Sequence, residues 1–336
     1  MASTSELTSV ADDEAVVHID GAARVYGDLS PGTDYAYDGH EFRTFADLGE
    51  RLATVATVND VHFGETVCGI LEGYDDGPTF STEPGDDPYP EVMNRSVIAD
   101  IAAIAPDAVV AKGDLTTQGI AEEYEAFLAH YGTAFGDRLL QVRGNHDAYA
   151  GETFAADAPV ARVLPGVVLA VLDTVIPTAT PGQLTVEQLE WLDDLAATAD
   201  RPVLVFGHHH VWSPDSNHRP DGYFGINPDD SERLVEVVAR RPAIAGYFAG
   251  HTHRNRVRRI SATGTVPWVE VACVKDFPGA WAEYRVCERG ILQVHRRASA
   301  PEALAWTDKT RAMFGGAYVD YAFGALEDRC LLVGAG

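Results

Sequence analysis

Residues 243–253 read AIAGYFAGHTH, an apolar run followed by a glycine and two histidines, and this stretch is the clearest indication of the fold class. A short apolar run bounded by Pro and Gly is typical of a strand that is buried on both faces. From Leu52 onward the chain repeats the same order of apolar run, polar loop and helical stretch. That alternation predicts a layered α/β domain whose strands are largely parallel.

Five apolar runs of this kind end in side chains that can bind a metal ion. These side chains are, in chain order, Asp60, His62, Asp114, Asn145, His208, His251 and His253. Loops at the carboxyl ends of strands form the ligand crevice of an open α/β sheet, so residues far apart in the sequence can meet there. Glycine lacks a Cβ and lets the chain turn sharply off a strand. The glycines that precede these side chains are Gly113, Gly144, Gly207 and Gly250.

The chemistry of these seven side chains indicates more than one metal ion. They supply two carboxylates, one amide oxygen and four imidazoles, which is too many for one tetrahedral zinc. They include no thiolate, and a mixed oxygen and nitrogen set suits Mn, Fe, Zn or Co better than Ca or Mg. Two such ions, about 3.5–4 Å apart, activate a bridging water and clamp an in-line displacement at phosphorus. We therefore expect a dinuclear site.

The ordered blocks D-x-H, G-D, G-N-H-D, G-H and G-H-x-H resemble the calcineurin-like metallophosphoesterase superfamily, across about residues 52 to 275. The resemblance implies a four-layer α/β/β/α sandwich with a two-metal site at its rim. It assigns the first ion to Asp60, His62 and His253. It assigns the second ion to Asn145, His208 and His251, with Asp114 bridging both ions.

Two more side chains take catalytic roles in the same resemblance. His146 is expected to lie near the phosphate without binding metal, and Asp147 is expected to orient it. The fourth block leaves an alternative open, because three histidines follow Gly207. The family places the ligand directly after this glycine, which favours His208, and His209 stays open as the alternative.

The resemblance extends to two branches of the superfamily. Residues 113–119 (GDLTTQG) resemble class III cyclic-nucleotide phosphodiesterases and related glycerophosphodiesterases. Residues 208–214 (HHHVWSP) look more like purple acid phosphatases, and residues 29–45 are similar to the end of a fibronectin-III-like domain that precedes some of those enzymes. However, a purple acid phosphatase would carry a tyrosine a few residues after Asp114, and residues 115–118 (LTTQ) contain none.

These observations favour a dinuclear metal-dependent phosphodiesterase that hydrolyses small phosphodiesters by attack of a metal-bridging hydroxide. A 3′,5′-cyclic nucleotide is the first candidate substrate. The alternative is a phosphomonoesterase or nucleotide pyrophosphatase on the same two-metal site. A non-catalytic scaffold is disfavoured, because all seven ligand positions are filled.

The composition changes along the chain divide it into four parts. Residues 1–14 are small, polar and acidic, which predicts a disordered tail. Residues 15–50 alternate short strands with turns and predict a small β appendage, a fibronectin-III-like fragment. Residues 51–300 form the expected catalytic domain, whose strands after Thr265 are expected to build a second, partly antiparallel sheet. Residues 301–336 are a C-terminal extension without a clear pattern.

Charge and leader signals limit the expected partners and location. The chain has 51 acidic and 25 basic residues and a formal charge of −26, which repels polymeric nucleic acid and anionic membranes. The four cysteines lie far apart, and no signal peptide or membrane span is visible. We expect a cytoplasmic protein whose partner is a small phosphoester substrate, and a homodimer is left open.

Two softer signals surround the expected site. Arg254, Arg256 and Arg258 alternate along the chain, so a strand would place them on one face. We interpret that face as solvated, with a phosphate-attracting rim as the alternative. The long loop after His208 is well placed to cover a substrate.

Overall fold

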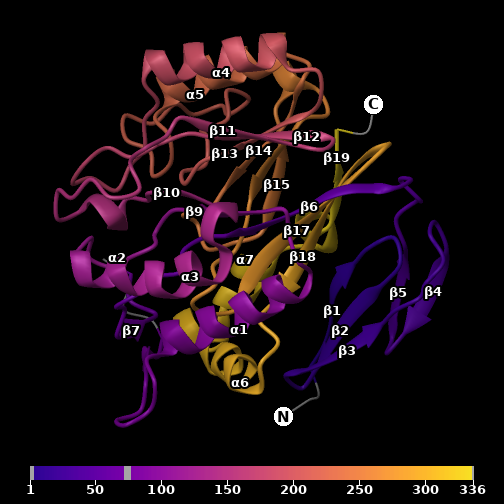
Figure 1. The fold of residues 1–336 in the computed structure, drawn as a ribbon. Coiled ribbons are helices and arrows are strands. Elements are labelled where there is room, and N and C mark those ends of the chain that lie inside the picture. Colours follow the sequence, from indigo (N-terminus) through magenta and orange to yellow (C-terminus); the bar gives the residue numbers. More distant parts are fainter. Residues whose placement is uncertain (1–3, 72–76, 335–336) are drawn as a thin grey trace.

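Two six-stranded mixed sheets stack face to face, and helices cover the outer face of each sheet (Figure 1). This computed structural model describes residues 4–71 and 77–334. The first sheet has the order β10-β9-β6-β17-β18-β19 and the second has the order β11-β12-β13-β14-β16-β15. The expected four-layer α/β/β/α sandwich is therefore confirmed.

The strands of the two sheets have the following bounds. Those of the first sheet are β6 (Arg51–Val58), β9 (Ala108–Lys112), β10 (Leu139–Val142), β17 (Ala280–Cys287), β18 (Gly290–Arg297) and β19 (Leu331–Val333). Those of the second sheet are β11 (Val160–Leu164), β12 (Val167–Val171), β13 (Val203–Phe206), β14 (Ile244–Ala249), β15 (Arg256–Arg259) and β16 (Pro267–Glu270).

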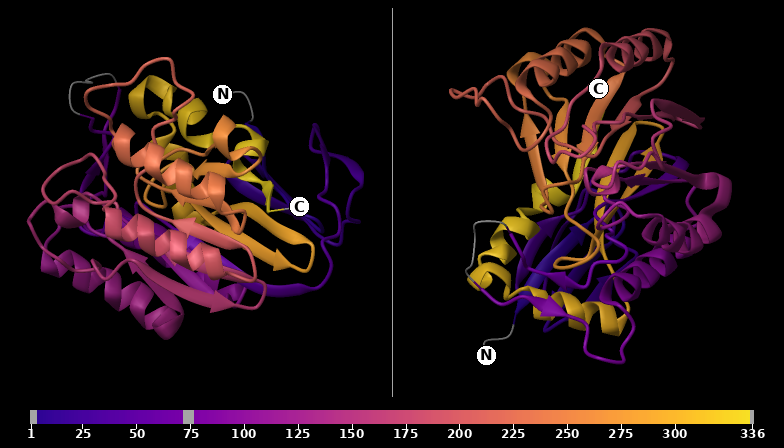
Figure 2. Two further views of the ribbon diagram at one scale, coloured as in Figure 1. Left: turned by 90° about the horizontal axis from the view of Figure 1, so that it is seen from above. Right: turned by 90° about the vertical axis from the view of Figure 1, so that its left-hand side faces the viewer.

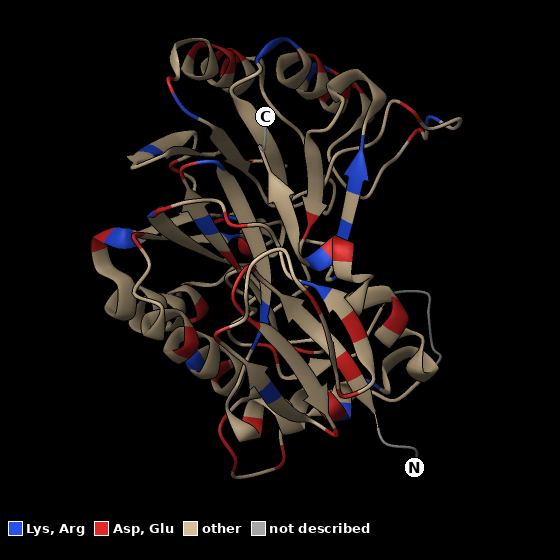
Figure 3. Ribbon diagram, turned by 90° about the vertical axis from the view of Figure 1, so that its right-hand side faces the viewer, with Lys and Arg blue, Asp and Glu red and all other residues tan. Residues whose placement is uncertain are grey.

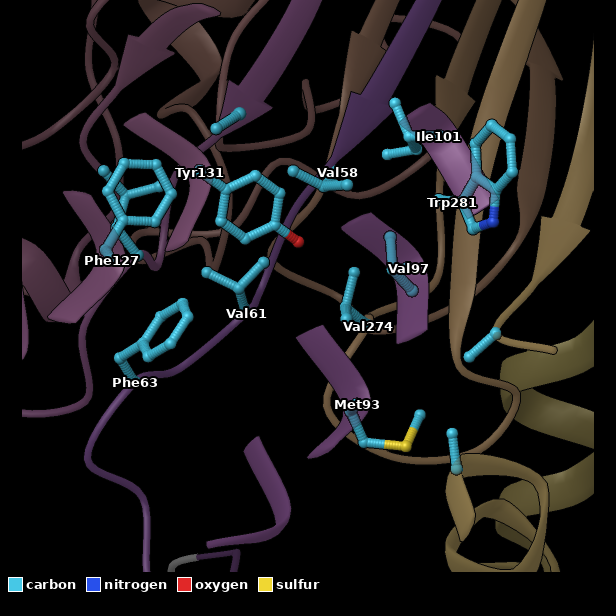
Figure 4. Packing of buried hydrophobic residues seen from close by; sticks show 14 of the residues in the cluster. Val58, Val61, Phe63, Met93, Val97, Ile101, Phe127, Tyr131, Val274 and Trp281 are labelled. Atoms are coloured by element: carbon cyan, nitrogen blue, oxygen red, sulfur yellow. The ribbon is translucent and has the colours of Figure 1, made fainter. Parts of the chain in front are cut away.

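Each outer layer is a set of helices that packs on one sheet. The first sheet is covered by α1 (Tyr89–Ala103), α2 (Ala121–Phe127), α3 (Thr133–Phe135) and α6 (Pro301–Thr310), and the second by α4 (Val186–Thr198) and α5 (Pro228–Arg240). Figure 4 shows Met93, Val97 and Ile101 of α1 packed in one cluster with Val58 and Trp281 of the first sheet. No described helix is long and apolar enough to cross a membrane.

Alternation along each central strand explains why its sequence is apolar throughout. In β9, Ala108 and Val110 face the second sheet, whereas Val109 and Ala111 face the helices. All four side chains are buried, so both faces of the strand require apolar residues. The first apolar layer lies between the two sheets, and the second and third lie beneath the helices.

The strands after Thr265 do not form a sheet of their own. The β17–β18 hairpin pairs antiparallel with β6 and so joins the first sheet, while β16 pairs with β14 in the second. The expectation of a separate second sheet is therefore wrong. The hairpin can extend the first sheet because β6 has β9 on one side only, which leaves its other edge free to pair.

The N-terminal residues form strands where their composition predicted a disordered tail. A small antiparallel sheet contains β1 (Ser5–Val10), β2 (Ala15–Ile19) and β3 (Ala22–Tyr26), and a hairpin follows from β4 (Asp34–Tyr37) and β5 (His40–Arg43). The views in Figure 2 show these indigo strands beside the first sheet, away from α4 and α5. The prediction of disorder over residues 1–14 is therefore wrong for β1, whereas residues 1–3 lie outside the described part.

Ion pairs explain why acidic N-terminal residues are ordered. Glu6 pairs with Arg311 and Arg297, and Asp12 lies 2.6 Å from Arg285. Acidic side chains that would be solvated in a tail are here bound to arginines of the first sheet and of the segment after α6. The likeness of residues 15–50 to a fibronectin-III fragment stays a prediction.

The described residues 301–334 complete the two-sheet sandwich instead of extending from it. Besides α6, they contribute α7 (Tyr318–Phe323), α8 (Leu326–Arg329) and β19, which pairs with β18 at the edge of the first sheet. Elsewhere, β7 (Val67–Cys68) pairs antiparallel with β8 (Phe80–Ser81). The carboxyl ends of β6, β9, β10, β13 and β14 carry the expected metal ligands.

Candidate metal centre

The backbone turns sharply at most of the expected ligands. Asp60, His62, Asp114, His251 and His253 all have positive φ angles, between 47° and 69°. Residues other than glycine adopt this conformation uncommonly, and such residues cluster at functional sites. The strand ends therefore accept local strain while placing these side chains.

Two of the glycines are required by close approach to the ligands. Gly113 has a φ of +87°, and a Cβ there would lie 2.5 Å from Nδ1 of His208. A Cβ on Gly250 would lie 2.7 Å from Oδ2 of Asp60. The expectation that glycine lets neighbouring ligand loops meet is confirmed at these positions.

The first group of donors contains four of the expected ligands. Asp60, His62, Asp114 and His253 each offer a ligand atom within 4.8 Å of the others. Nε2 of His253 lies 3.3 Å from Oδ1 of Asp60, and Nε2 of His62 lies 3.6 Å from Oδ2 of Asp114. These are the residues expected at the first ion, together with the bridging carboxylate.

His62 provides an independent test of whether a metal fits this group. Its side chain is buried, and neither ring nitrogen has a hydrogen-bond partner in the described structure. Burial lowers the pKa of His62 well below its usual value, so the imidazole is neutral with a lone pair available. Buried polar atoms without partners are rare in native proteins. A metal ion among these four donors would satisfy the imidazole.

The second group of donors lies on the other side of Asp114. Nε2 of His208 lies 3.0 Å from Oδ1 of Asn145 and 3.3 Å from Oδ2 of Asp114. The amide of Asn145 donates to the Tyr149 hydroxyl at 2.7 Å, which turns its oxygen toward His208. The ring centroids of His208 and His251 are 5.0 Å apart. Asp114 is thus adjacent to both groups, as a bridging ligand would be.

The carboxylate of Asp114 and the imidazole of His208 stabilise each other's charged form. Burial opposes protonation of His208, but the charge of Asp114 overcomes it and raises the pKa of His208 to about 9. Burial likewise opposes ionisation of Asp114, whereas His208 and His146 hold its pKa well below the usual value. The site therefore favours positive charge next to Asp114, which is the requirement for cation binding.

The structure favours His208 over His209 as the ligand of the second group. His209 also lies within 4.8 Å of His208 and His251. However, its Nδ1 is 2.8 Å from the Thr174 hydroxyl and its Nε2 is 2.9 Å from the Thr180 carbonyl. Both partners of His209 lie outside the donor set, whereas Nε2 of His208 faces Asn145 and Asp114, so His208 is the better placed ligand.

His146 lies beside the first group but is not oriented by Asp147. Its ring centroid is 4.6 Å from that of His62, and its Nδ1 lies 2.6 Å from the Thr117 carbonyl. Because a carbonyl can only accept, Nδ1 carries the proton. The expectation that Asp147 orients this imidazole is therefore wrong, and the Thr117 carbonyl does so.

The buried carboxylate of Asp147 holds two loops together. It accepts hydrogen bonds from the backbone N–H groups of Leu115, Thr116 and Gly144, and from the Thr116 hydroxyl. Its oxygens are occupied by these donors and so do not reach His146. Burial and the nearby charge of Asp114 raise the pKa of Asp147 to about 6.

The loop after His208 contacts the second group through Phe224. The Phe224 carbonyl accepts a hydrogen bond from Nε2 of His251 at 2.8 Å, which fixes this ring nitrogen as the donor. The Phe224 ring stacks on His251 with centroids 4.0 Å apart and is 51% exposed. The sequence pointed to the loop but not to this residue, since a lone phenylalanine carries no motif.

Two residues at the ends of ligand-bearing strands were also missed by sequence reasoning. Asn59 donates from its amide to Asp60 at 2.5 Å and to the Val271 carbonyl at 3.0 Å. The backbone carbonyl of Lys112 accepts from Nδ1 of His208 at 2.9 Å. Their only signal in the sequence is their position at the end of a ligand-bearing strand.

The arginines beyond the last ligand are mostly paired. The guanidinium groups of Arg254 and Arg258 lie 2.8 and 3.5 Å from the buried Glu270 carboxylate. Figure 3 shows β15 in blue with acidic residues close by, and the Val257 N–H donates to Asp328 at 2.8 Å. The interpretation as a solvated face therefore holds for the exposed Arg256 and is wrong for the other two.

Comparison with known proteins agrees with this geometry. Residues 53–255, more than half of the chain, match the family described as Calcineurin-like phosphoesterase. The glycerophosphodiester phosphodiesterase GpdQ of Enterobacter lignolyticus is 29% identical over 48% of this chain and 61% of its own length. A cAMP/cGMP dual specificity phosphodiesterase of Mycobacterium tuberculosis is 29% identical over 48% of this chain and 52% of its own length. This chain thus spans less than two thirds of either relative.

A solved structure shows the same fold. The crystal structure of a dimetal phosphatase from Danio rerio aligns with a TM-score of 0.53 at 14% sequence identity, over 74% of this chain and 97% of that one. The sandwich, the ordered ligand blocks and the match over residues 53–255 agree. The chain therefore belongs to the calcineurin-like phosphoesterase family.

Proposed function

We propose that this protein is a dinuclear metal-dependent phosphodiesterase of small phosphodiesters, with 3′,5′-cyclic nucleotides as the first candidate substrates. The observation that carries the proposal is the position of Asp114, which lies next to two groups of oxygen and imidazole donors. Relatives named as glycerophosphodiester and cyclic nucleotide phosphodiesterases support a diester substrate.

The donors divide between two divalent ions drawn from Mn, Fe, Zn and Co. The first ion would be held by Asp60, His62 and His253, and the second by Asn145, His208 and His251, with Asp114 on both. Such ions, when bound, polarise phosphoryl oxygens and lower the pKa of water.

His146 is the side chain that handles the proton of the leaving group. Its Nδ1–H is bound to the Thr117 carbonyl, which leaves Nε2 for the substrate. In the imidazolium form, Nε2 donates its proton to the departing alkoxide oxygen, and the imidazole becomes neutral. The Thr117 carbonyl keeps the ring in place in both forms.

The charges around the site favour a diester over a monoester. A monoester dianion carries a second negative charge, which needs an additional cation. The buried ammonium of Lys275 lies 2.7 Å from the Glu65 carboxylate, and Arg254 is bound to Glu270. These cations are neutralised by their own partners, whereas a diester monoanion requires only the metal ions.

Metal analysis and a substrate comparison test the proposal. Protein stripped with a chelator and reconstituted with Mn²⁺ should bind two ions per chain and lose its activity when chelator is added again. It should have a higher kcat/KM for bis(p-nitrophenyl) phosphate than for p-nitrophenyl phosphate, and it should hydrolyse 3′,5′-cyclic AMP. Well under one ion per active chain would refute the two-metal site, and preference for the monoester would establish the phosphomonoesterase alternative.

A further inference from the structure

One charged side chain lies in the apolar layer between the two sheets. Lys112 is the last residue of β9, where Ala108 and Val110 face the second sheet and alternation directs Lys112 the same way. Its side chain is fully buried. Burial lowers the pKa of the Lys112 ammonium to about 7. Burying a basic group among apolar side chains is costly, so a residue of this kind calls for a specific reason.

Lys112 binds both neighbouring strands of the opposite sheet. Its ammonium donates to the carbonyl of Ala249, the last residue of β14, at 2.9 Å. Its backbone carbonyl accepts from Nδ1 of His208, which follows β13, at 2.9 Å. One residue of the first sheet is thus bonded to the ends of two strands of the second.

Those three strand ends carry ligands from both sides of the site. Asp114 follows Lys112 on the first sheet, whereas His208 and His251 follow β13 and β14 on the second. The donor set therefore spans the junction of two separate sheets. The distance between the sheets at this point sets the distance from Asp114 to the two histidines.

The ammonium is not needed to satisfy the carbonyl that it binds. The Ala249 carbonyl already accepts a hydrogen bond from the Val271 N–H at 3.0 Å. An apolar side chain of similar length would fill the same volume without a buried charge. Packing and hydrogen-bond satisfaction alone thus leave the lysine unexplained.

We propose that Lys112 is a positioning residue that links the two sheets directly behind the donor set and holds His208 and His251 at the correct distance from Asp114. The proposal rests on the two-metal function proposed above. The ligands of the second ion lie on both sheets. Removing the ammonium should therefore lower the affinity for the second ion without a matching loss in the stability of the fold.

The variant Lys112→Met, which keeps the length of the side chain and removes the ammonium, tests the proposal. Calorimetric titration with Mn²⁺ should show one of the two ions bound about 10–100-fold more weakly. This is the usual effect of losing a residue that holds a metal ligand in place. The absorption spectrum of the Co²⁺-loaded protein should change, and kcat should fall more than KM rises. When both proteins are kept metal-free by a chelator, the Tm of the variant should equal or exceed that of the wild type.

Arg297→Met is the matched control. Arg297 is also a buried cation that donates to a backbone carbonyl, that of Pro278 at 2.7 Å, but it lies away from the donor set. This variant should lower the Tm and leave the affinity for Mn²⁺ unchanged. If Lys112→Met does not fold, Lys112→Gln, whose amide is too short to reach Ala249, should show the same weakened ion.

The outcomes separate the two proposals. A wild-type protein that binds fewer than one ion refutes the proposed function. If the wild type binds two ions, and the lysine variant has the same Mn²⁺ affinities and the same Co²⁺ spectrum, the proposed function stands and the role of Lys112 is overturned. An equal loss of affinity in Arg297→Met, or a loss explained by a lower Tm in chelator, also overturns it.

Discussion

At the scale of single residues, Asp114 lies between the two groups of donors. Its Oδ2 approaches both His62 and His208, and its Oδ1 accepts from the His146 N–H at 3.0 Å. Losing a residue that only holds a metal ligand in place typically costs about 10–100-fold in affinity or activity. Because Asp114 is itself the proposed bridging ligand, we expect Asp114→Ala to reduce kcat/KM by more than about 100-fold. His62→Ala, which removes a ligand of one ion only, should lose less.

Metal content distinguishes these two variants. Asp114→Ala should bind both ions weakly, whereas His62→Ala should retain one ion, and mass spectrometry of metals after dialysis measures the difference. Similar mild losses of activity and metal in both variants would contradict the bridging role of Asp114.

His146 has a different expected signature because it binds no metal in the proposed assignment. General acid catalysis typically contributes 10²–10⁴-fold, so His146→Ala should reduce kcat by about that factor on a diester with a poor alkoxide leaving group. On bis(p-nitrophenyl) phosphate the loss should be small, because p-nitrophenolate leaves without a proton. Metal content should be unchanged. Equal losses on both substrates would eliminate the general-acid role.

At the scale of elements, the turn between β9 and Asp114 depends on Gly113. The positive φ and the closeness of His208 together exclude a side chain here. Gly113→Ala should displace the His208 ring and lower the affinity for the second ion by at least about 10-fold. This is the lower end of the effect of changing a residue that holds a metal ligand in place. Calorimetric titration with Mn²⁺ measures this.

Gly151→Ala is a suitable control for this turn. Gly151 also has a positive φ of +82°, but no atom lies within 4 Å of a Cβ built there. Both substitutions introduce similar backbone strain, and only Gly113→Ala introduces the contact with His208. Equal Mn²⁺ affinities in the two variants would show that the close approach does not matter.

The N-terminus of helix α4 shows which contacts the local sequence can predict and which it cannot. Thr185 and Gln188 have the spacing of a capping box, but only one half of the box forms, in which the Thr185 hydroxyl accepts from the Gln188 N–H at 3.3 Å. The Gln188 side chain, however, binds the backbone N–H and carbonyl of Asp173, each at 2.8 Å. The cap is local and could be predicted, whereas the partner of Gln188 comes from a distant loop.

At the scale of the whole molecule, the N-terminal sheet contains a buried histidine that lies near arginines of the first sheet and of the C-terminal segment. His18 bonds to the Thr8 hydroxyl at 2.7 Å, and burial, with Arg297, Arg311 and Arg329 nearby, lowers its pKa to about 3. Between about pH 6.5 and pH 3 the unfolded chain protonates this histidine and the folded chain does not. His18 therefore costs stability as the pH falls through this window, about 1.4 kcal/mol per pH unit.

The variant His18→Gln removes this titration. In chelator, the free energy of unfolding of the wild type should fall more steeply than that of the variant as the pH is lowered from about 7 to about 5. Urea unfolding at both values of pH measures the difference. Equal slopes for the two proteins would contradict a buried neutral His18.

Local sequence patterns were sufficient to predict the class of fold and the set of donors. Apolar runs that end in Asp, Asn or His are local features, and the positions of strands and turns follow from them. The order of the five blocks then pointed to the family, to the seven expected ligands and to the sandwich. His208 could be preferred but not separated from His209, because both follow the same strand.

The partner of each side chain, in contrast, depends on how the folded chain packs. The Thr117 carbonyl rather than Asp147 holds His146, Glu270 binds Arg254, and Lys112 links the two sheets. The acidic N-terminus forms a strand because its partners are arginines that lie hundreds of residues away. A hydrogen bond or ion pair depends on the distance between two groups in space, and the packing of two sheets, not spacing along the chain, sets that distance.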